Sequence, residues 1–181
     1  MCAGEHLKGN LVKLATLGAL VIVDSRERTP WRFENLPVER GTLATGDYSV
    51  RGLETLIAVE RKSRADLVAC CGRERARFVA ELVRLRAYRF RAVVVEATLA
   101  DLERGDWPGK LTPAHVLGSI ASWQVRYAPF VFAGDADAAA RWAERYLLQA
   151  ARAIAERYSA ARAVLVTGVM ATGNRCARVV Y

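Results

Sequence analysis

The pattern of apolar and polar positions divides the chain into strands and helices. Strands are predicted at 20–24, 42–50, 55–61, 92–97 and 130–132, most of them short apolar runs bounded by turn residues. Apolar residues spaced three and four apart predict helices from Ala65 onward with a break at Cys71-Gly72, over 113–126, and after Gly134-Asp135. Prolines predict a loop at 26–40, and 101–109 is a polar excursion.

The order of these elements predicts an α/β domain whose central mixed sheet is flanked by helices. A turn around Arg51-Gly52 would fold 42–50 back beside 55–61 as a hairpin. Later strands alternate with helices, which predicts parallel crossover connections. Ala163–Val169 is a candidate for an added edge strand.

Charged residues lie within or at the end of three of the predicted strands. Glu60, Arg61 and Lys62 directly follow an apolar run. Because side chains alternate along a strand, Glu60 and Lys62 share one face and Arg61 points to the other. The hairpin would place Asp47 next to Glu60, and Asp24 ends a third strand.

Paired carboxylates at this position predict metal-assisted hydrolysis of a phosphodiester. Carboxylate oxygens hold Mg²⁺ or Mn²⁺ and leave coordination positions for water and phosphate. Lys62 would orient or deprotonate the attacking water, or stabilise charge on the phosphate, and the sequence leaves these roles open. A solvated ion pair on an edge strand is the alternative interpretation of Glu60 and Lys62.

Three segments in order resemble the nuclease domain of the XPF-type structure-specific endonucleases, and more distantly the restriction-endonuclease-like fold. They are Val23-Asp24-Ser25-Arg26-Glu27, Gly46-Asp47-Tyr48 and Glu60-Arg61-Lys62-x-x-x-Asp66. The resemblance covers roughly Leu20 to Arg152. It implies a metal-dependent DNA endonuclease that acts on branched, flapped or junction DNA.

The resemblance also implies roles for single residues. Asp24, Asp47 and Glu60 would bind Mg²⁺ or Mn²⁺, and Lys62 would be the base or water-orienting group. Arg26 and Arg61 would support phosphate or neighbouring carboxylates. Asp66 would hold the start of the following helix, where Ser63 has the position of an N-cap, or would hold Arg61.

Positive charge is concentrated after Gly72. The formal net charge is +8, from 27 Lys and Arg against 19 Asp and Glu, which favours a polyanionic partner. The helix that follows is rich in arginine, and Arg73, Arg77 and Arg84 are the predicted DNA contacts. A solvated helix face with intrahelical ion pairs is the alternative.

Several wider expectations follow from what the sequence lacks. The adjacent Cys70 and Cys71, with Cys2 and Cys176, suit neither disulfides nor zinc and are expected as free thiols. No signal peptide or basic membrane-surface helix is recognised, so an intracellular location, cytoplasmic or nucleoid-associated, is expected. No glycine-rich phosphate loop supports a nucleotide-binding domain.

The chain is expected to divide into an N-terminal segment 1–19, a nuclease domain 20–158 and a C-terminal extension 159–181. No tandem helix-hairpin-helix pattern is recognised after Ile154, which predicts a bare nuclease domain. The apolar face of 139–154 is wide, and is either a homodimer surface of the C-terminal helices or simply part of a large core. A catalytically inactive DNA-binding or scaffolding subunit is the competing function, although the acids and Lys62 are all retained.

Overall fold

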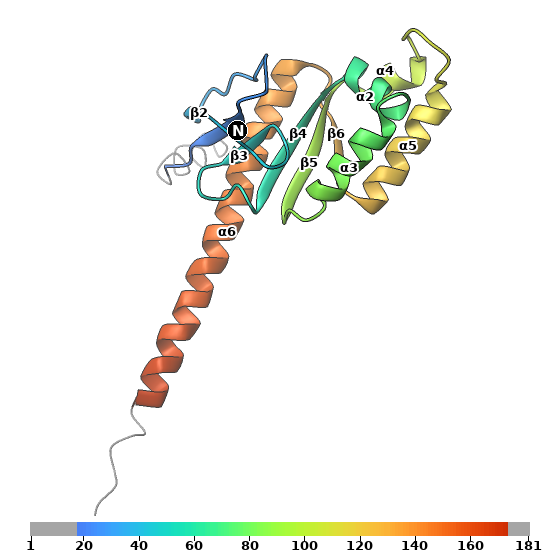
Figure 1. Ribbon diagram of the computed structural model, residues 1–181. Helices are drawn as coiled ribbons and strands as arrows, with labels where there is room; N and C mark the ends of the chain where they lie inside the picture. The colour runs from blue at the N-terminus through green and yellow to red at the C-terminus, as the bar shows by residue number, and fades with distance from the viewer. Residues whose placement is uncertain (1–17, 174–181) are drawn as a thin grey trace, which may run out of the picture.

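Six strands form one mixed sheet in the computed structural model, which describes residues 18–173 and their side chains as far as Ser159 (Figure 1). The strand order across the sheet is β2-β1-β3-β4-β5-β6. The strands are β1 (Val21–Asp24), β2 (Val38–Gly41), β3 (Tyr48–Val50), β4 (Ile57–Ser63), β5 (Phe90–Glu96) and β6 (Phe130–Phe132).

The two halves of the sheet differ in strand direction. β3 runs antiparallel to both β1 and β4, while β4, β5 and β6 are parallel. The predicted hairpin is therefore confirmed, with Gly52 in the left-handed conformation at φ 79° in its turn. The predicted parallel crossovers are confirmed as well, and the longest pairing joins all of β4 to β5.

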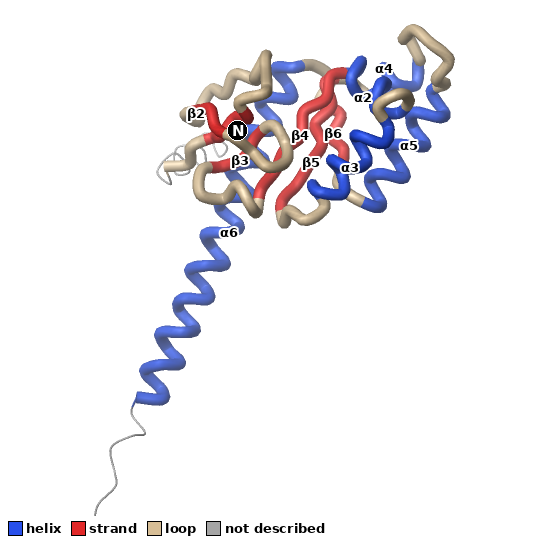
Figure 2. The backbone as a smooth tube through the Cα atoms, in the orientation of Figure 1, coloured by secondary structure: helices blue, strands red, loops and turns tan. Residues whose placement is uncertain are grey.

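Five helices cover the two faces of the sheet (Figure 2). One face carries α2 (Arg64–Cys71), α3 (Arg75–Leu85), α4 (Leu99–Arg104) and α5 (Pro113–Arg126). Their apolar side chains, among them Phe78, Leu82 and Trp123, form one core with Ala58, Val93 and Val95 of the sheet. The predicted stripe Phe78, Leu82, Leu85 is fully buried in it.

The opposite face of the sheet is covered by α6 (Ala136–Gly173). Ala139, Ala143 and Leu147 pack there on Val23 and Val59 in a second core. The wide apolar face of 139–154 is therefore core for most of its residues, as one of the two interpretations held. A dimer surface built from these buried side chains would not be accessible.

The second half of α6 projects away from the sheet (Figure 1). The predicted edge strand at 163–169 is wrong, because the helix continues through this segment to Gly173. Its sequence contains no proline, and the first glycine after Ala136 is Gly168, so nothing breaks the helix earlier. Residues 1–17 and 174–181, with Cys2, His6 and Cys176, lie outside the described residues.

Three short elements differ from the expectation. β2 lies in the predicted loop 26–40, residues 42–47 form a loop instead of part of a strand, and α4 occupies the polar excursion at 101–109. β2 is an exposed edge strand, so it needs no apolar alternation. α4 is a short helix with one buried residue, Leu102, and it depends on the capping box of Thr98 and Asp101.

Two further observations bear on the chemistry. Cys70 and Cys71 are buried free thiols, as predicted. Burial raises the pKa of Cys70 to about 12 and that of Cys71 to about 11, so both are protonated at neutral pH. Among the described helices, none has the length and apolar character needed to cross a membrane.

Candidate active site

The predicted acids meet at one face of the sheet, in a cleft of about 280 Å³. Asp24 ends β1, Asp47 precedes β3, and Glu60 and Lys62 lie in β4. Strand alternation directs Glu60 and Lys62 toward the face that carries α3. The cleft is lined by Asp24, Arg26, Glu27, Ala44, Thr45, Gly46, Asp47, Glu60, Lys62, Arg77, Glu81 and Arg84.

Backbone hydrogen bonds fix Asp47 beside Glu60. The Asp47 amide donates to Val59 O at 2.8 Å, and the Arg61 amide donates to Asp47 Oδ2 at 2.7 Å. Gly46 permits this approach, because it has φ 80° and a Cβ there would lie 3.0 Å from Val59 O. The predicted neighbourhood of Asp47 and Glu60 is thus confirmed.

Glu60 and Lys62 form a buried ion pair, with the whole residues only 8% and 9% exposed. Burial raises the pKa of Glu60, and the Lys62 ammonium offsets this only in part. Burial favours the neutral form of Lys62, but the Glu60 carboxylate outweighs it and raises the pKa of Lys62. The alternative of a solvated pair does not hold, because both side chains are enclosed.

Asp47 is held in an environment that disfavours its charge. Burial, followed by repulsion from Glu60, raises its pKa from 3.8 to about 7. The amide of Arg61 and the charge of Lys62 act in the opposite direction but do not compensate. A cation placed against Asp47 and Glu60 would relieve this repulsion.

Asp24 has the opposite character. Burial alone would raise its pKa, but hydrogen bonds from Arg26 and from the Leu43 amide lower the pKa below its ordinary value. Arg26 Nε and Nη2 donate to the two carboxylate oxygens at 2.6 and 3.0 Å, and Leu43 N donates to Oδ2 at 2.8 Å. Asp24 is thus fully engaged, and Arg26 supports a carboxylate as the sequence predicted.

Arg61 points to the opposite face, as strand alternation predicts. Its guanidinium donates to Glu96 at 2.7 Å, pairs with Glu27 at 3.3 Å and lies over the Trp31 ring. Glu96 also accepts from Trp31 Nε1 at 2.6 Å, so it is a structural partner on the face away from the cleft. Trp31 is buried and stacks on Tyr48 at 4.5 Å, which makes it a packing residue.

Asp66 is placed at the start of α2 and does not line the cleft. Its amide donates to Ser63 Oγ at 3.1 Å, and Ser63 Oγ donates to Asp66 Oδ2 at 2.6 Å. The predicted N-cap at Ser63 is confirmed. Asp66 therefore holds the start of the helix, which is one of the two roles proposed for it, and its hydrogen bonds are to Ser63 and not to Arg61.

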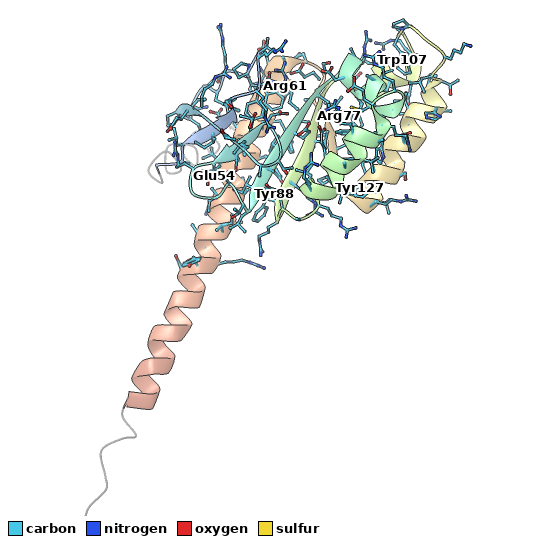
Figure 3. The ribbon with its side chains drawn as sticks, viewed as in Figure 1. Glu54, Arg61, Arg77, Tyr88, Trp107 and Tyr127 are labelled. Atoms are coloured by element: carbon cyan, nitrogen blue, oxygen red, sulfur yellow. The ribbon has the colours of Figure 1, made fainter. Side chains whose placement is uncertain are left out.

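The predicted DNA-binding arginines separate into two groups. Arg77 and Arg84 of α3 line the cleft, and Figure 3 labels Arg77 on this helix. Arg77 is held between Glu74 and Glu81, so the helix face carries the ion pairs of the alternative interpretation as well. Arg73 is highly exposed and lines a different pocket.

Glu81 is a cleft residue that sequence reasoning missed. Its Oε1 accepts from Arg77 at 2.7 Å, while Oε2 is buried without a hydrogen-bond partner. Its charge also contributes to the raised pKa of Glu60. The only sequence signal was an acid four residues after Arg77, which is common on solvated helices.

The donor set of the cleft fits a hard divalent cation. Within the part of the chain that the structure describes, no three His, Cys, Asp or Glu side chains stand close enough together to enclose a metal ion. Asp24 is engaged by Arg26, and Glu60 by Lys62. Mg²⁺ nevertheless needs only one or two carboxylates beside water and phosphate, and Asp47 and Glu60, which both line the cleft, supply hard oxygen ligands.

Comparisons with known proteins find related sequences and folds. The family model described as "ERCC4 domain" matches residues 23–146. The solved structure of XPF from Aeropyrum pernix in complex with DNA is 23% identical with a TM-score of 0.59, over 74% of this chain and 65% of that chain. Another structure of XPF from Aeropyrum pernix is 20% identical with a TM-score of 0.59, over 82% of this chain and 73% of that chain. Curated proteins give no match.

Proposed function

Because the chain belongs to the ERCC4 domain family, we propose that it is a divalent-metal-dependent endonuclease that hydrolyses phosphodiester bonds in DNA. The observation that carries the proposal is the buried cluster of Asp47, Glu60 and Lys62 in a cleft bordered by arginines. Burial disfavours the charged forms of Asp47 and Glu60, and repulsion from Glu60 adds to this for Asp47, so a cation bound between them would stabilise both carboxylates.

Asp47 and Glu60 would hold the cation, and the negative charge of the neighbouring Glu81 would favour a cation in the cleft. Bound there, Mg²⁺ or Mn²⁺ would supply Lewis-acid stabilisation of the phosphate and lower the pKa of a bound water. Asp24 contributes in a different way, because Asp24 and its partner Arg26 both hydrogen-bond to the backbone of Leu43 and so hold that loop beside the cleft. For Asp24 to bind the cation directly, as the sequence predicted, the cation would have to displace Arg26 from the Asp24 carboxylate.

Lys62 is best suited to stabilising negative charge. Its raised pKa keeps the ammonium protonated at neutral pH, so it would orient water or neutralise phosphate charge and would not act as the base in this state. Arg77 and Arg84 would position the DNA backbone at the mouth of the cleft.

Branched, flapped or junction DNA is the proposed substrate class, in keeping with a family of structure-specific nucleases. The chain spans 65% of the length of the XPF chain solved with DNA, so that protein's DNA binding supports the proposal only by analogy. An inactive scaffolding subunit is the competing function, and the intact cleft argues against it. We also propose an intracellular location, because branched and junction DNA occurs inside cells.

The proposed nuclease domain comprises residues 20–158, and a homodimer through the C-terminal helices is proposed as well. The contacts of such a dimer would lie beyond the buried part of α6, where Tyr158 is 79% exposed. The projecting half of this helix leaves the body without covering the sheet (Figure 1).

The proposal is tested with Glu60→Gln and Asp47→Asn, each of which keeps size and removes a charge. Cleavage of flap, fork, bubble and single-stranded DNA would be measured with Mg²⁺ or Mn²⁺, and binding to the same DNA by anisotropy. We expect loss of cleavage with DNA binding largely retained. The exposed Glu156→Gln on α6 is the matched control. Wild-type cleavage by either folded cleft variant would refute the metal-site assignment.

A further inference from the structure

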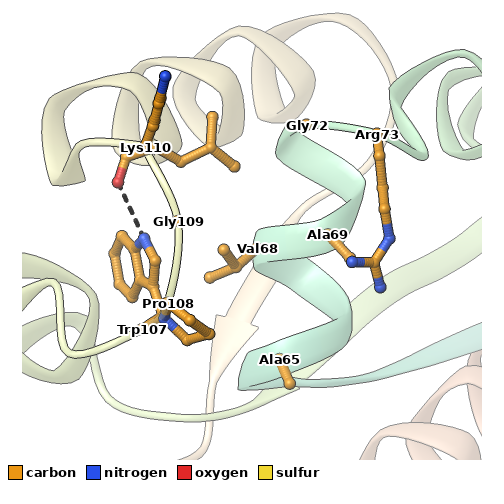
Figure 4. A pocket seen from close by; sticks show the side chains of 10 residues that line it. Ala65, Val68, Ala69, Gly72, Arg73, Trp107, Pro108, Gly109 and Lys110 are labelled. Atoms are coloured by element: carbon orange, nitrogen blue, oxygen red, sulfur yellow. Dashed lines mark hydrogen bonds between the residues drawn. The ribbon is translucent and has the colours of Figure 1, made fainter.

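A second pocket, of about 400 Å³, lies against α2 and shares no lining residue with the cleft (Figure 4). Ala65, Val68 and Ala69 of α2 line the pocket, whereas no residue of α2 lines the cleft, so the two sites are distinct. The volume is in the range of preformed small-ligand sites.

The wall facing Val68 is the indole ring of Trp107, with Pro108 beside it (Figure 4). Trp107 Nε1 donates to Leu111 O at 2.9 Å, which fixes the ring, and the partly buried ring packs on the core beneath. An aromatic surface that is already ordered loses little entropy when a flat ligand stacks on it.

The charges at this pocket all have the same sign. Of its lining residues, only Arg73 and Lys110 are charged, and the Arg73 side chain is 82% exposed. The nearby Asp106 is itself paired with Arg104 at 3.4 Å. An apolar slot with an aromatic wall and a cationic rim matches a base joined to phosphates.

We infer that this pocket binds an unpaired nucleotide of a single-stranded DNA segment. The base stacks on Trp107, and flanking phosphates contact Arg73 and Lys110. The inference rests on the proposed function for the class of ligand, and it assigns Arg73 a place on the path of the strand outside the cleft. A junction with an unpaired arm would thereby be held at two points, in the cleft and in this pocket.

Fluorescence titration of the full chain with oligothymidylate in EDTA tests the inference without requiring cleavage. The DNA should quench tryptophan emission by stacking on Trp107. The quenching would report on this residue, because Trp31 and Trp123 are buried and Trp142 stacks on Tyr146. Trp107→Phe should lose the quenching and keep the affinity within about twofold, whereas Trp107→Ala should weaken binding roughly tenfold. The double variant Arg73→Ala/Lys110→Ala should weaken binding and reduce the salt slope by about 1.4.

Arg141→Ala on α6, which covers the opposite face of the sheet, is the control and should leave binding unchanged. Quenching that survives in Trp107→Phe, or a salt slope unchanged by the double variant, would overturn the inference. If Trp107→Ala does not fold, the double variant Arg73→Ala/Lys110→Ala still tests the inference, because it changes only exposed side chains and should fold normally. Cleavage by a wild-type protein that shows no quenching would refute the pocket alone. Quenching without cleavage would refute the nuclease proposal alone.

Discussion

Single residues of the cleft are held in protonation states that the ordinary side-chain pKa values do not predict. Asp47 and Asp24 are both aspartates near the same cleft, yet the pKa of one is raised and that of the other lowered. The difference arises because the Asp24 carboxylate accepts hydrogen bonds from the Arg26 guanidinium and from two backbone amides, while the Asp47 carboxylate accepts from one amide and faces Glu60. This contrast leads to a pH prediction.

Between pH 3.8 and about 7, folded Asp47 holds a proton that the unfolded chain has lost. Its contribution to the free energy of unfolding therefore falls as pH rises through this window and is lowest above it. We expect Asp47→Asn to raise Tm by several degrees at pH 8 in EDTA and to change it little at pH 4, since about 1 kcal/mol shifts Tm by roughly 2–4 °C. Thermal unfolding at both pH values checks this, and an equal shift at both would contradict it.

Lys62 separates cation binding from chemistry. Lys62→Ala removes a positive charge that repels the metal, so calorimetry should show Mn²⁺ affinity that persists or rises. Single-turnover cleavage by the same preparation should fall roughly a hundredfold or more, because the group that positions water or balances phosphate charge is gone. Lost metal binding with the fold intact would show instead that Lys62 only holds Glu60.

Glu81 should contribute to cation affinity although it lies outside the motifs that predicted the site. Glu81→Gln keeps the oxygen that accepts from Arg77 but removes charge at the unpartnered oxygen, so Mn²⁺ affinity should fall roughly tenfold. Glu74→Gln is the matched control, because Glu74 is the other partner of Arg77 and does not line the cleft. Equal effects of the two substitutions on calorimetric affinity would exclude a specific contribution of Glu81 to cation binding.

At the scale of elements, α3 provides one wall of the cleft with Arg77 and Arg84. Replacing both by alanine should weaken DNA binding almost uniformly across sequences and reduce the salt slope by about one to two. The free energy of unfolding should change little, because only exposed ion pairs with Glu74 and Glu81 are lost. Affinity measured at several salt concentrations checks this, and an unchanged slope would place the DNA on another face.

The sequence predicted the elements whose residues follow a strong apolar period or a strong cap. β1, β5, α5 and β6 agree with the prediction within about a residue or two, and so does the placing of Asp47 beside Glu60. β2 and α4 were missed because Val38 is exposed and α4 buries only one side chain, so neither shows a period.

The contacts that the site residues make were less predictable than the identity of those residues. The hydrogen bond from the Leu43 amide to Asp24, and the entry of Glu81 into the cleft, depend on how loops and α3 pack in three dimensions. No spacing in the sequence specifies these contacts. The burial of the 139–154 face likewise depends on which side of the sheet α6 covers.

At the scale of the whole molecule, the described core contacts of α6 end near Ile154. A chain ending at Ser159 should therefore unfold at nearly the same Tm as the full chain, which agrees with the proposed domain limit at 158. Calorimetry of both proteins checks this, and a Tm lower by more than about 5 °C would show that the projecting half of α6 stabilises the domain. Sedimentation of the same pair would reveal whether that half is required for a dimer.

The use of two cores on opposite faces of one sheet also sets an order for folding during synthesis. The core beneath α2 to α5 draws on residues up to Phe130, whereas the other core needs α6 as far as Leu148 and Ala150. Domains begin to fold as they leave the ribosome. The apolar side chains of Val21, Val23 and Val59 consequently lack their covering helix, α6, until nearly all of the domain has been translated. A pause in translation before α6 would expose this apolar face longest, so chaperone capture of nascent chains should be greatest there.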